Sequence, residues 1–159
     1  MKRTQDLKAQ YQLQMDEEGI LLAAATILEH RLQRQGRIHS PEQAGSYLVA
    51  RCAHLPREVF GCIFLDTKHH ILATEHLFTG TTDACEVHSR VVAKRALELN
   101  AVAVILFHNH PSGNPEPSQA DRQVTKRLQE ALGLLDIRVL DHLVIGGRQH
   151  VSLASRGWA

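Results

Sequence analysis

The sequence predicts an α/β domain with three layers, in which a mixed β-sheet is flanked by helices. Segments with helical periodicity alternate with strand-like runs, and helices between strands require crossover connections that make some strands parallel. The run 101–107 (AVAVILF) is apolar at every position, which is typical of a strand buried on both faces of a sheet. A length of 159 residues, 43% of them hydrophobic, suffices for one domain with a core.

Two helices are predicted near the start of the chain. Residues 17–35 are rich in Leu and Ala and are followed by a glycine, which is a common helix end. Ser40 is a favoured N-cap residue, Pro41 suits the first helical position, and Gln43 can reach back to the cap. A second helix should therefore run from this point to about Ala53.

The middle of the chain predicts a β-hairpin and then a helix. Residues 58–65 (EVFGCIFL) and 71–78 are strand-like and are separated by a loop of about five residues. Apolar residues recur at i, i+4 and i+7 in the segment 86–99, as in an amphipathic helix. This helix leads into the apolar strand at 101–107.

The last third predicts a loop, a helix and two closing strands. The loop HNHPSGNPEP is dense in Pro and Gly, and Ser118 after it is placed to cap a helix. The segments 137–145 and 150–153 are strand-like and are separated by two glycines. The predicted order of elements is therefore α α β β α β α β β. The expected buried stripe of the last helix is Val124, Leu128, Ala131 or Leu132, and Leu135.

Composition limits the classes of function and the compartment. The 18 Lys and Arg against 17 Asp and Glu give a net charge of +1, so no global field attracts nucleic acid. The sequence shows neither an apolar stretch long enough for a bilayer nor a signal-peptide pattern at its start, which favours the cytoplasm. Cys52, Cys62 and Cys85 are too few and too scattered for a disulfide framework, so reduced thiols are expected.

Chemistry is predicted where the apolar strand ends. His108 and His110 are two residues apart on an extended chain, so both imidazoles project to the same side. Asp121 lies in the first turn of the next helix, and the loop between them can fold that turn back over the strand. Two histidines and one carboxylate with an open fourth position are typical of a catalytic zinc site. Ser118 and Asp121 also suit the N-cap and third position of a helix, which is a structural alternative.

The spacing of these residues resembles a known motif. His108-x-His110-x7-Ser118-x2-Asp121 is similar, without a gap, to the JAMM (MPN+ or JAB) metalloprotease motif. The wider segments REVF, FTGT, HNHPSGNPEPSQAD and DHLVIGG resemble the RadC family within that superfamily, over about residues 40–159. The resemblance implies a JAB/MPN fold, related to the cytidine-deaminase architecture. We interpret residues 1–36 as an N-terminal helical segment and residues 37–159 as the MPN domain.

The resemblance also implies a reaction and its residues. The family would hold one Zn²⁺ per chain through His108, His110 and Asp121, with Glu58 of REVF as general base and Ser118 stabilising the oxyanion. The implied activity is a zinc-dependent metallohydrolase that cleaves peptide or isopeptide bonds, with a protein or peptide as substrate partner. The oligomeric state is left open, because apolar residues on the N-terminal helices suit either dimerisation or packing on the domain.

A nucleic-acid-associated module linked to DNA repair, without peptidase activity, is the alternative. The name of the family suggests it, although solvated helix faces explain the basic residues equally well. The letters HNH do not indicate a nuclease, because that motif extends over a much longer unit, and a zinc deaminase requires a CxxC that the chain lacks. The basic residues in question are Arg90, Lys94 and Arg95 on one helix and Arg122, Lys126 and Arg127 on the other.

Two adjacent residues in the penultimate strand stand out. Asp141 falls on the apolar alternation of its strand, which predicts a β-bulge or a break there. His142 follows it and is a candidate for a group behind the metal ligands. The other histidines share no spacing with the motif and are expected at the surface or in packing.

Overall fold

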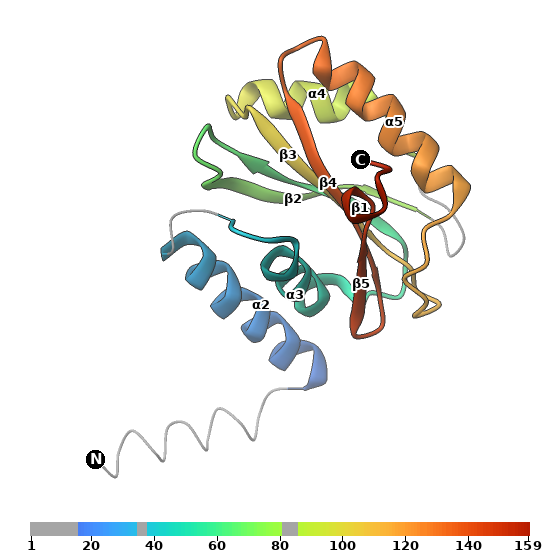
Figure 1. Cartoon of the computed structure of the whole chain (residues 1–159). Coiled ribbons are helices and arrows are strands. Elements are labelled where there is room, and N and C mark those ends of the chain that lie inside the picture. The colour runs from blue at the N-terminus through green and yellow to red at the C-terminus, as the bar shows by residue number, and fades with distance from the viewer. Residues whose placement is uncertain (1–15, 35–37, 81–85) are drawn as a thin grey trace.

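The computed structural model describes residues 16–34, 38–80 and 86–159 of the chain. In these ranges the elements follow the predicted order, with a short 3₁₀-helix added at the end (Figure 1). The prediction that Gly36 ends the first helix lies outside the described residues, and so does Cys85. The elements are α2 (Glu17–Arg34), α3 (Pro41–Cys52), β1 (Val59–Leu65), β2 (Ile71–Thr79), α4 (Ser89–Glu98), β3 (Ala103–Asn109), α5 (Gln119–Gly133), β4 (Arg138–Gly146), β5 (Gln149–Ser152) and η1 (Ala154–Arg156).

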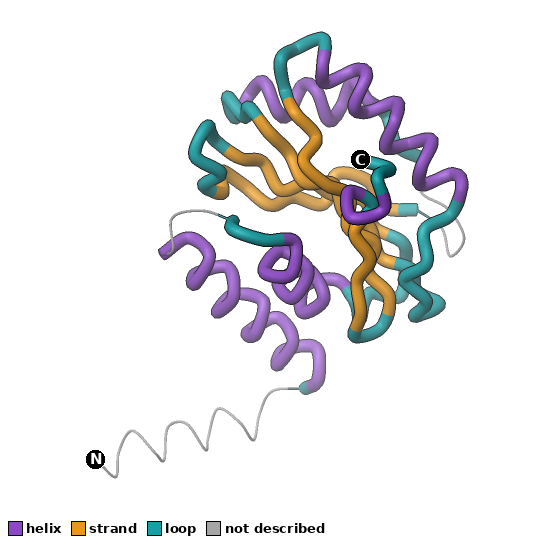
Figure 2. Tube along the Cα trace, viewed as in Figure 1, coloured by secondary structure: helices purple, strands orange, loops and turns teal. Residues whose placement is uncertain are grey.

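The strands form one five-stranded mixed sheet in the order β2-β1-β3-β4-β5. The β1 strand runs antiparallel to both β2 and β3, whereas β3 and β4 are parallel and β5 returns antiparallel to β4. The helices α2 and α3 lie on one side of the sheet, and α4 and α5 lie on the other (Figure 2). The predicted three-layer α/β architecture with a mixed sheet is confirmed.

Alternation along β3 divides the core into two halves. Ala103, Ile105 and Phe107 pack with residues of α3, whereas Val104 and Leu106 pack with residues of α4 and α5. Every residue of β3 is buried, as its unbroken apolar run predicts. The side chain of His108, two residues after Leu106, is therefore expected on the α5 side of the sheet as well.

The helix capping by Ser40 is confirmed, with one difference in detail. The Ser40 side chain accepts a hydrogen bond from the Gln43 backbone N–H, and Pro41 occupies the first turn of α3. The Gln43 side chain, however, accepts from the backbone N–H of His39 at 3.0 Å, one residue before the cap. The α2 helix packs on α3, and its Ala25 lies in the α3 half of the core.

The β-bulge predicted at Asp141 is present. Val104 aligns with Val139, but the next residue, Ile105, aligns with Asp141, so Leu140 is extra. Leu140 packs on the α3 half of the core, and beyond the bulge His142 aligns with Leu106. The bulge thus turns the His142 side chain to the α5 side of the sheet.

The predicted buried stripe of α5 is partly wrong. Leu128 and Leu132 are buried as predicted, but the third buried position is Thr125, and Val124 is only partly buried. Leu135 is 40% exposed because α5 ends at Gly133 and the chain turns through Asp136, which has a positive φ of 58°.

The described cysteines agree with the expectation of reduced thiols. Cys52 and Cys62 are buried free thiols, and burial raises the pKa of Cys52 to about 12. Among the described helices, none is both long enough and apolar enough to cross a membrane.

Candidate metal centre

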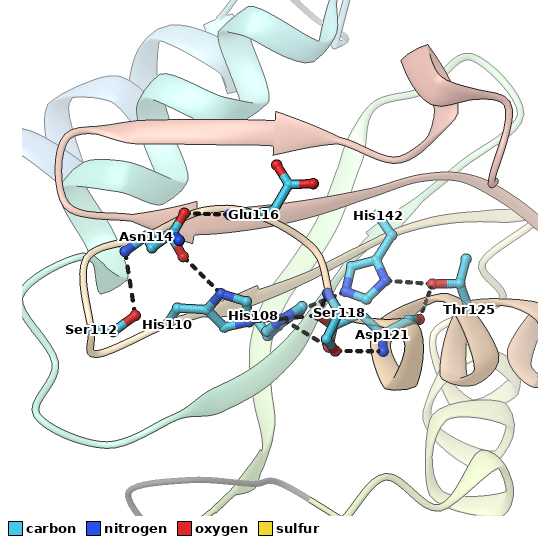
Figure 3. A network of polar contacts seen from close by, with 9 residues as sticks. All are labelled: His108, His110, Ser112, Asn114, Glu116, Ser118, Asp121, Thr125 and His142. Carbon is cyan, nitrogen blue, oxygen red and sulfur yellow. Dashed lines mark hydrogen bonds and ion pairs between the residues drawn. The ribbon is translucent and has the colours of Figure 1, made fainter.

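The end of β3 presents two histidines to the first turn of α5. His108 continues the row of Val104 and Leu106, and its side chain is 1% exposed. His110 follows the strand, and its side chain is 19% exposed. The two Nε2 atoms are 2.9 Å apart, so both rings point at the same small volume (Figure 3).

The third group is the Asp121 carboxylate, which the N-terminus of α5 aims at the histidines. The Ser118 side chain accepts from the Asp121 backbone N–H at 3.1 Å, and Asp121 Oδ2 accepts from the Ser118 N–H at 2.7 Å. In this capping box Asp121 Oδ1 lies 3.2 Å from His108 Nε2, and Oδ2 lies 3.6 Å from His110 Nε2. The structural and the ligand roles of Asp121 are therefore compatible.

The loop between the strand and the helix folds back over the sheet edge. The backbone N–H of His110 donates to the carbonyl of Ile145 at 2.7 Å, and a Cβ built on Gly146 would lie 2.4 Å from Pro115 N. Only a glycine allows that approach. Glu116 in the loop is held by both guanidinium nitrogens of Arg156, so the end of the chain also fixes the loop.

The hydrogen-bond partner of His110 leaves its Nε2 available for a ligand. His110 Nδ1 is 2.8 Å from the carbonyl oxygen of Asn114, and a carbonyl oxygen only accepts, so Nδ1 carries the hydrogen. In the neutral ring the Nε2 atom then has a lone pair, which faces His108 Nε2 and the carboxylate. These lone pairs repel one another unless a cation or a proton lies between them. Two imidazole nitrogens and one carboxylate are a set of donors that fits zinc.

The pKa values of the site reflect this crowding. Burial alone would raise the pKa of Asp121, but hydrogen bonds with His108 and His110, the charge of His108 and the backbone hydrogen bond from Ser118 outweigh it and hold the pKa well below its usual range. The hydrogen bond with Asp121 raises the pKa of His110, with a further contribution from the negative charge of Glu58. Complete burial, with the nearby charge of His108, keeps the pKa of His142 well below its ordinary value.

Comparison with known proteins decides the family. The model of the RadC-like JAB domain matches residues 38–158. The chain belongs to the RadC family. Similar relatives are UPF0758 proteins of Stutzerimonas stutzeri (strain A1501) and Azotobacter vinelandii (strain DJ / ATCC BAA-1303), 56% and 52% identical over 141 residues, which are 89% of this chain and 63% of each relative. A UPF0758 protein of Alcanivorax borkumensis (strain ATCC 700651 / DSM 11573 / NCIMB 13689 / SK2) is 55% identical over 143 residues, 87% of this chain and 64% of the relative. The chain spans less than two thirds of the length of these RadC-family relatives.

The structure brings the predicted site residues of this RadC-type domain to one edge of the sheet. His108, His110 and Asp121 each offer one atom that could bind a metal, and these atoms lie within 4.8 Å of one another. Glu58 is half-buried directly before β1, near enough for its charge to act on His110. Ser118 is exposed beside the ligands, and its hydroxyl hydrogen can still donate because its bond to Asp121 uses an oxygen lone pair.

Asn109 is a residue of the site that the sequence did not predict. In the sequence it stands between His108 and His110, and its buried side chain lies on the opposite face of the strand. Its Oδ1 accepts from the backbone N–H of Val59 at 2.8 Å, and its Nδ2 donates to the carbonyl of Arg57 at 3.0 Å. Asn109 therefore binds the backbone on both sides of Glu58. A buried polar residue between two ligands was the only signal available in the sequence.

Proposed function

We propose that this chain is a zinc-dependent metallohydrolase of the JAMM type, which cleaves peptide or isopeptide bonds in a protein or peptide. The observation that carries the proposal is the convergence of two imidazole Nε2 atoms and one carboxylate at the end of β3. His108, His110 and Asp121 would hold one zinc ion per chain. Zinc in a site with three protein ligands is a Lewis acid that brings the pKa of water near 7.

The residues of the chain itself would move the protons. In our proposal Glu58 takes a proton from the attacking water and delivers it to the nitrogen of the leaving amine. Its place before β1, with Phe60 paired to His108, keeps the carboxylate at the same edge as the ligands. Asn109 fixes the backbone around it.

Ser118 would act on the carbonyl oxygen of the bond that is cleaved. Its hydroxyl donates a hydrogen bond to that oxygen as negative charge develops. The capping box supports this role, because the bond from the Asp121 N–H holds the Ser118 oxygen beside the ligands and leaves its hydrogen free to donate. Loss of one such donor typically lowers the rate by about 10² to 10³.

The experiment is a hydrolysis assay on two substrate panels, one of quenched fluorescent peptides and one of peptides joined through a lysine ε-amine. The zinc-loaded protein is compared with chelated protein and with chelated protein given zinc again. Cleavage that disappears on chelation and returns with zinc is expected. Cleavage that persists in the chelated protein, or none by the zinc-loaded protein on either panel, would contradict the proposal.

Three of the six basic residues named for the nucleic-acid alternative make contacts within the chain. Arg95 is bound to Glu75, and Arg127 donates to the carbonyl of Val87. The guanidinium of Arg122 lies 4.9 Å from the centre of the Trp158 ring. A salt-dependent affinity for DNA would revive this alternative.

We further propose a reducing compartment, the cytoplasm, because the thiols of the described cysteines are free and buried.

A further inference from the structure

Behind the candidate ligands, a buried chain of hydrogen bonds connects α5, β4 and β3. Thr125 Oγ1 lies 2.7 Å from the backbone carbonyl of Asp121 and 2.6 Å from His142 Nδ1. His142 Nε2 lies 2.8 Å from His108 Nδ1 (Figure 3). This series of hydrogen bonds thus starts at the backbone carbonyl of Asp121 and ends at the side chain of His108.

The positions of the hydrogens in this chain follow from its first acceptor. A carbonyl oxygen only accepts, so the single hydroxyl hydrogen of Thr125 goes to Asp121. Thr125 Oγ1 must then accept from His142 Nδ1–H, which leaves His142 Nε2 with a lone pair. That lone pair accepts from His108 Nδ1–H, so His108 Nε2 carries no hydrogen in the neutral ring.

These groups are shielded from solvent. Thr125 and His142 are fully buried, and the Phe60 ring lies 5.5 Å from the ring of His142 and 6.2 Å from that of His108. An aromatic side chain against both imidazoles keeps water from substituting for a lost hydrogen bond. The Thr125 hydroxyl therefore determines which nitrogen donates and which accepts in each of these hydrogen bonds.

The bulge in β4 is what places His142 in this chain. Because Leu140 is extra, His142 aligns with Leu106 on the α5 side of the sheet. The Asp141 carboxylate stabilises the bulge, since it accepts from the His142 N–H at 2.7 Å, the Ala154 N–H at 3.0 Å and the Ser152 hydroxyl at 2.6 Å. Three hydrogen bonds to one carboxylate thus support a bulge that aims the His142 imidazole.

We propose that Thr125 and His142 are positioning residues that hold His108 in its Nδ1–H tautomer, so that Nε2 is the atom offered to the metal. This inference rests on the proposed metal site. Without the Thr125 hydroxyl, His142 Nδ1–H would have no acceptor. The chain would then reverse: His142 Nε2–H would donate to His108 Nδ1 and force the hydrogen of His108 onto Nε2, where it blocks a ligand bond.

The test compares Thr125→Val, which keeps the shape and removes the hydroxyl, with Thr125→Ser, which keeps the hydroxyl. Zinc affinity is measured by competition with a chromophoric chelator, and thermal unfolding is measured on the metal-free proteins. Groups behind a metal ligand typically contribute about 10 to 100-fold in affinity, so a loss of that size is expected for Thr125→Val but not for Thr125→Ser. A folded Thr125→Val protein that binds zinc as tightly as the wild type would overturn the inference.

A second measurement needs no metal and no variant. Long-range ¹H–¹⁵N correlation spectra of the metal-free wild-type protein report which ring nitrogen of each histidine carries the hydrogen. In spectra recorded at a pH where the two rings are neutral, Nδ1–H is expected for both His108 and His142, and a neutral ring with its hydrogen on Nε2 in either residue would overturn the inference, even if Thr125→Val fails to fold. If the wild type binds no zinc, the proposed function fails, whereas the tautomers still decide whether the hydrogen-bond chain is correct.

Discussion

The two sides of the sheet use the same strand for different purposes. On the α3 side, Phe107 of β3 packs with Tyr47 and Leu48, and the row ends in Asn109, whose buried amide binds the backbone around Glu58. On the α5 side, the row that begins with Val104 and Leu106 continues into His108. One change of residue type at the last inward position thus converts a packing surface into a candidate reaction site. Stability and chemistry should therefore separate by side.

The largest expected effect is on the reaction itself. Glu58→Gln removes the proposed general base, and the rate of hydrolysis should fall by about 10² to 10⁴, as is typical of general acid–base catalysis. Zinc should remain bound, because Glu58 is not among the three ligands. The measurement is the hydrolysis rate with the zinc content of the same sample, and Glu130→Gln on the exposed part of α5 is the control. An unchanged rate would remove Glu58 from the mechanism.

On the opposite side, Leu48→Ala should lower stability alone. Leu48 is fully buried in the α3 half of the core, and such a truncation costs about 2 to 5 kcal/mol of unfolding free energy. Zinc affinity of the folded protein should not change. Denaturant unfolding and zinc titration test both parts, with Leu22→Ala on α2, where the side chain is 59% exposed, as the control. A parallel loss of zinc affinity would show that the two sides are coupled.

Asn109→Ala should lower the rate of hydrolysis less than Glu58→Gln does. The Asn109 side chain binds the backbone beside Glu58 and does not contact the proposed metal ligands. Small displacements of a catalytic group can lower the rate by about 10 to 100-fold. Kcat is expected to fall while zinc content is retained. Exposed Gln123→Ala provides the control on α5. If zinc is lost together with activity, Asn109 supports the ligands themselves and not the base.

Over one pH unit, the smallest effect is the change of zinc affinity with pH. Asp121 raises the pKa of His110, so the proton that competes with zinc binds His110 more tightly than it binds an ordinary histidine. Below that raised pKa, affinity should fall by about tenfold per pH unit for each proton displaced, and above it the affinity should level off. Isothermal titration at several pH values measures this. Affinity that rises as the pH falls would contradict the ligand assignment.

The fold and the convergence of His108, His110 and Asp121 could be predicted because their signals are local. The apolar run of β3, the Ser40 and Ser118 caps and the spacing of His108, His110 and Asp121 all lie within short segments. The roles of Asn109 and Thr125 could not be predicted, since their partners are 50 and 17 residues away. The bulge at Asp141 was predicted from its polarity, but its effect on His142 depends on the alignment with β3.

The most direct test of the site is the zinc content of protein purified without added metal, for the wild type and for His108→Ala. Mass spectrometry of the intact native protein gives the stoichiometry, and the control is His39→Ala, which changes an exposed histidine two residues before α3. One zinc per chain in the wild type and in His39→Ala, and none in His108→Ala, is the expected result. A wild-type chain without a divalent metal that also fails to take up added zinc would contradict the metal site at the end of β3.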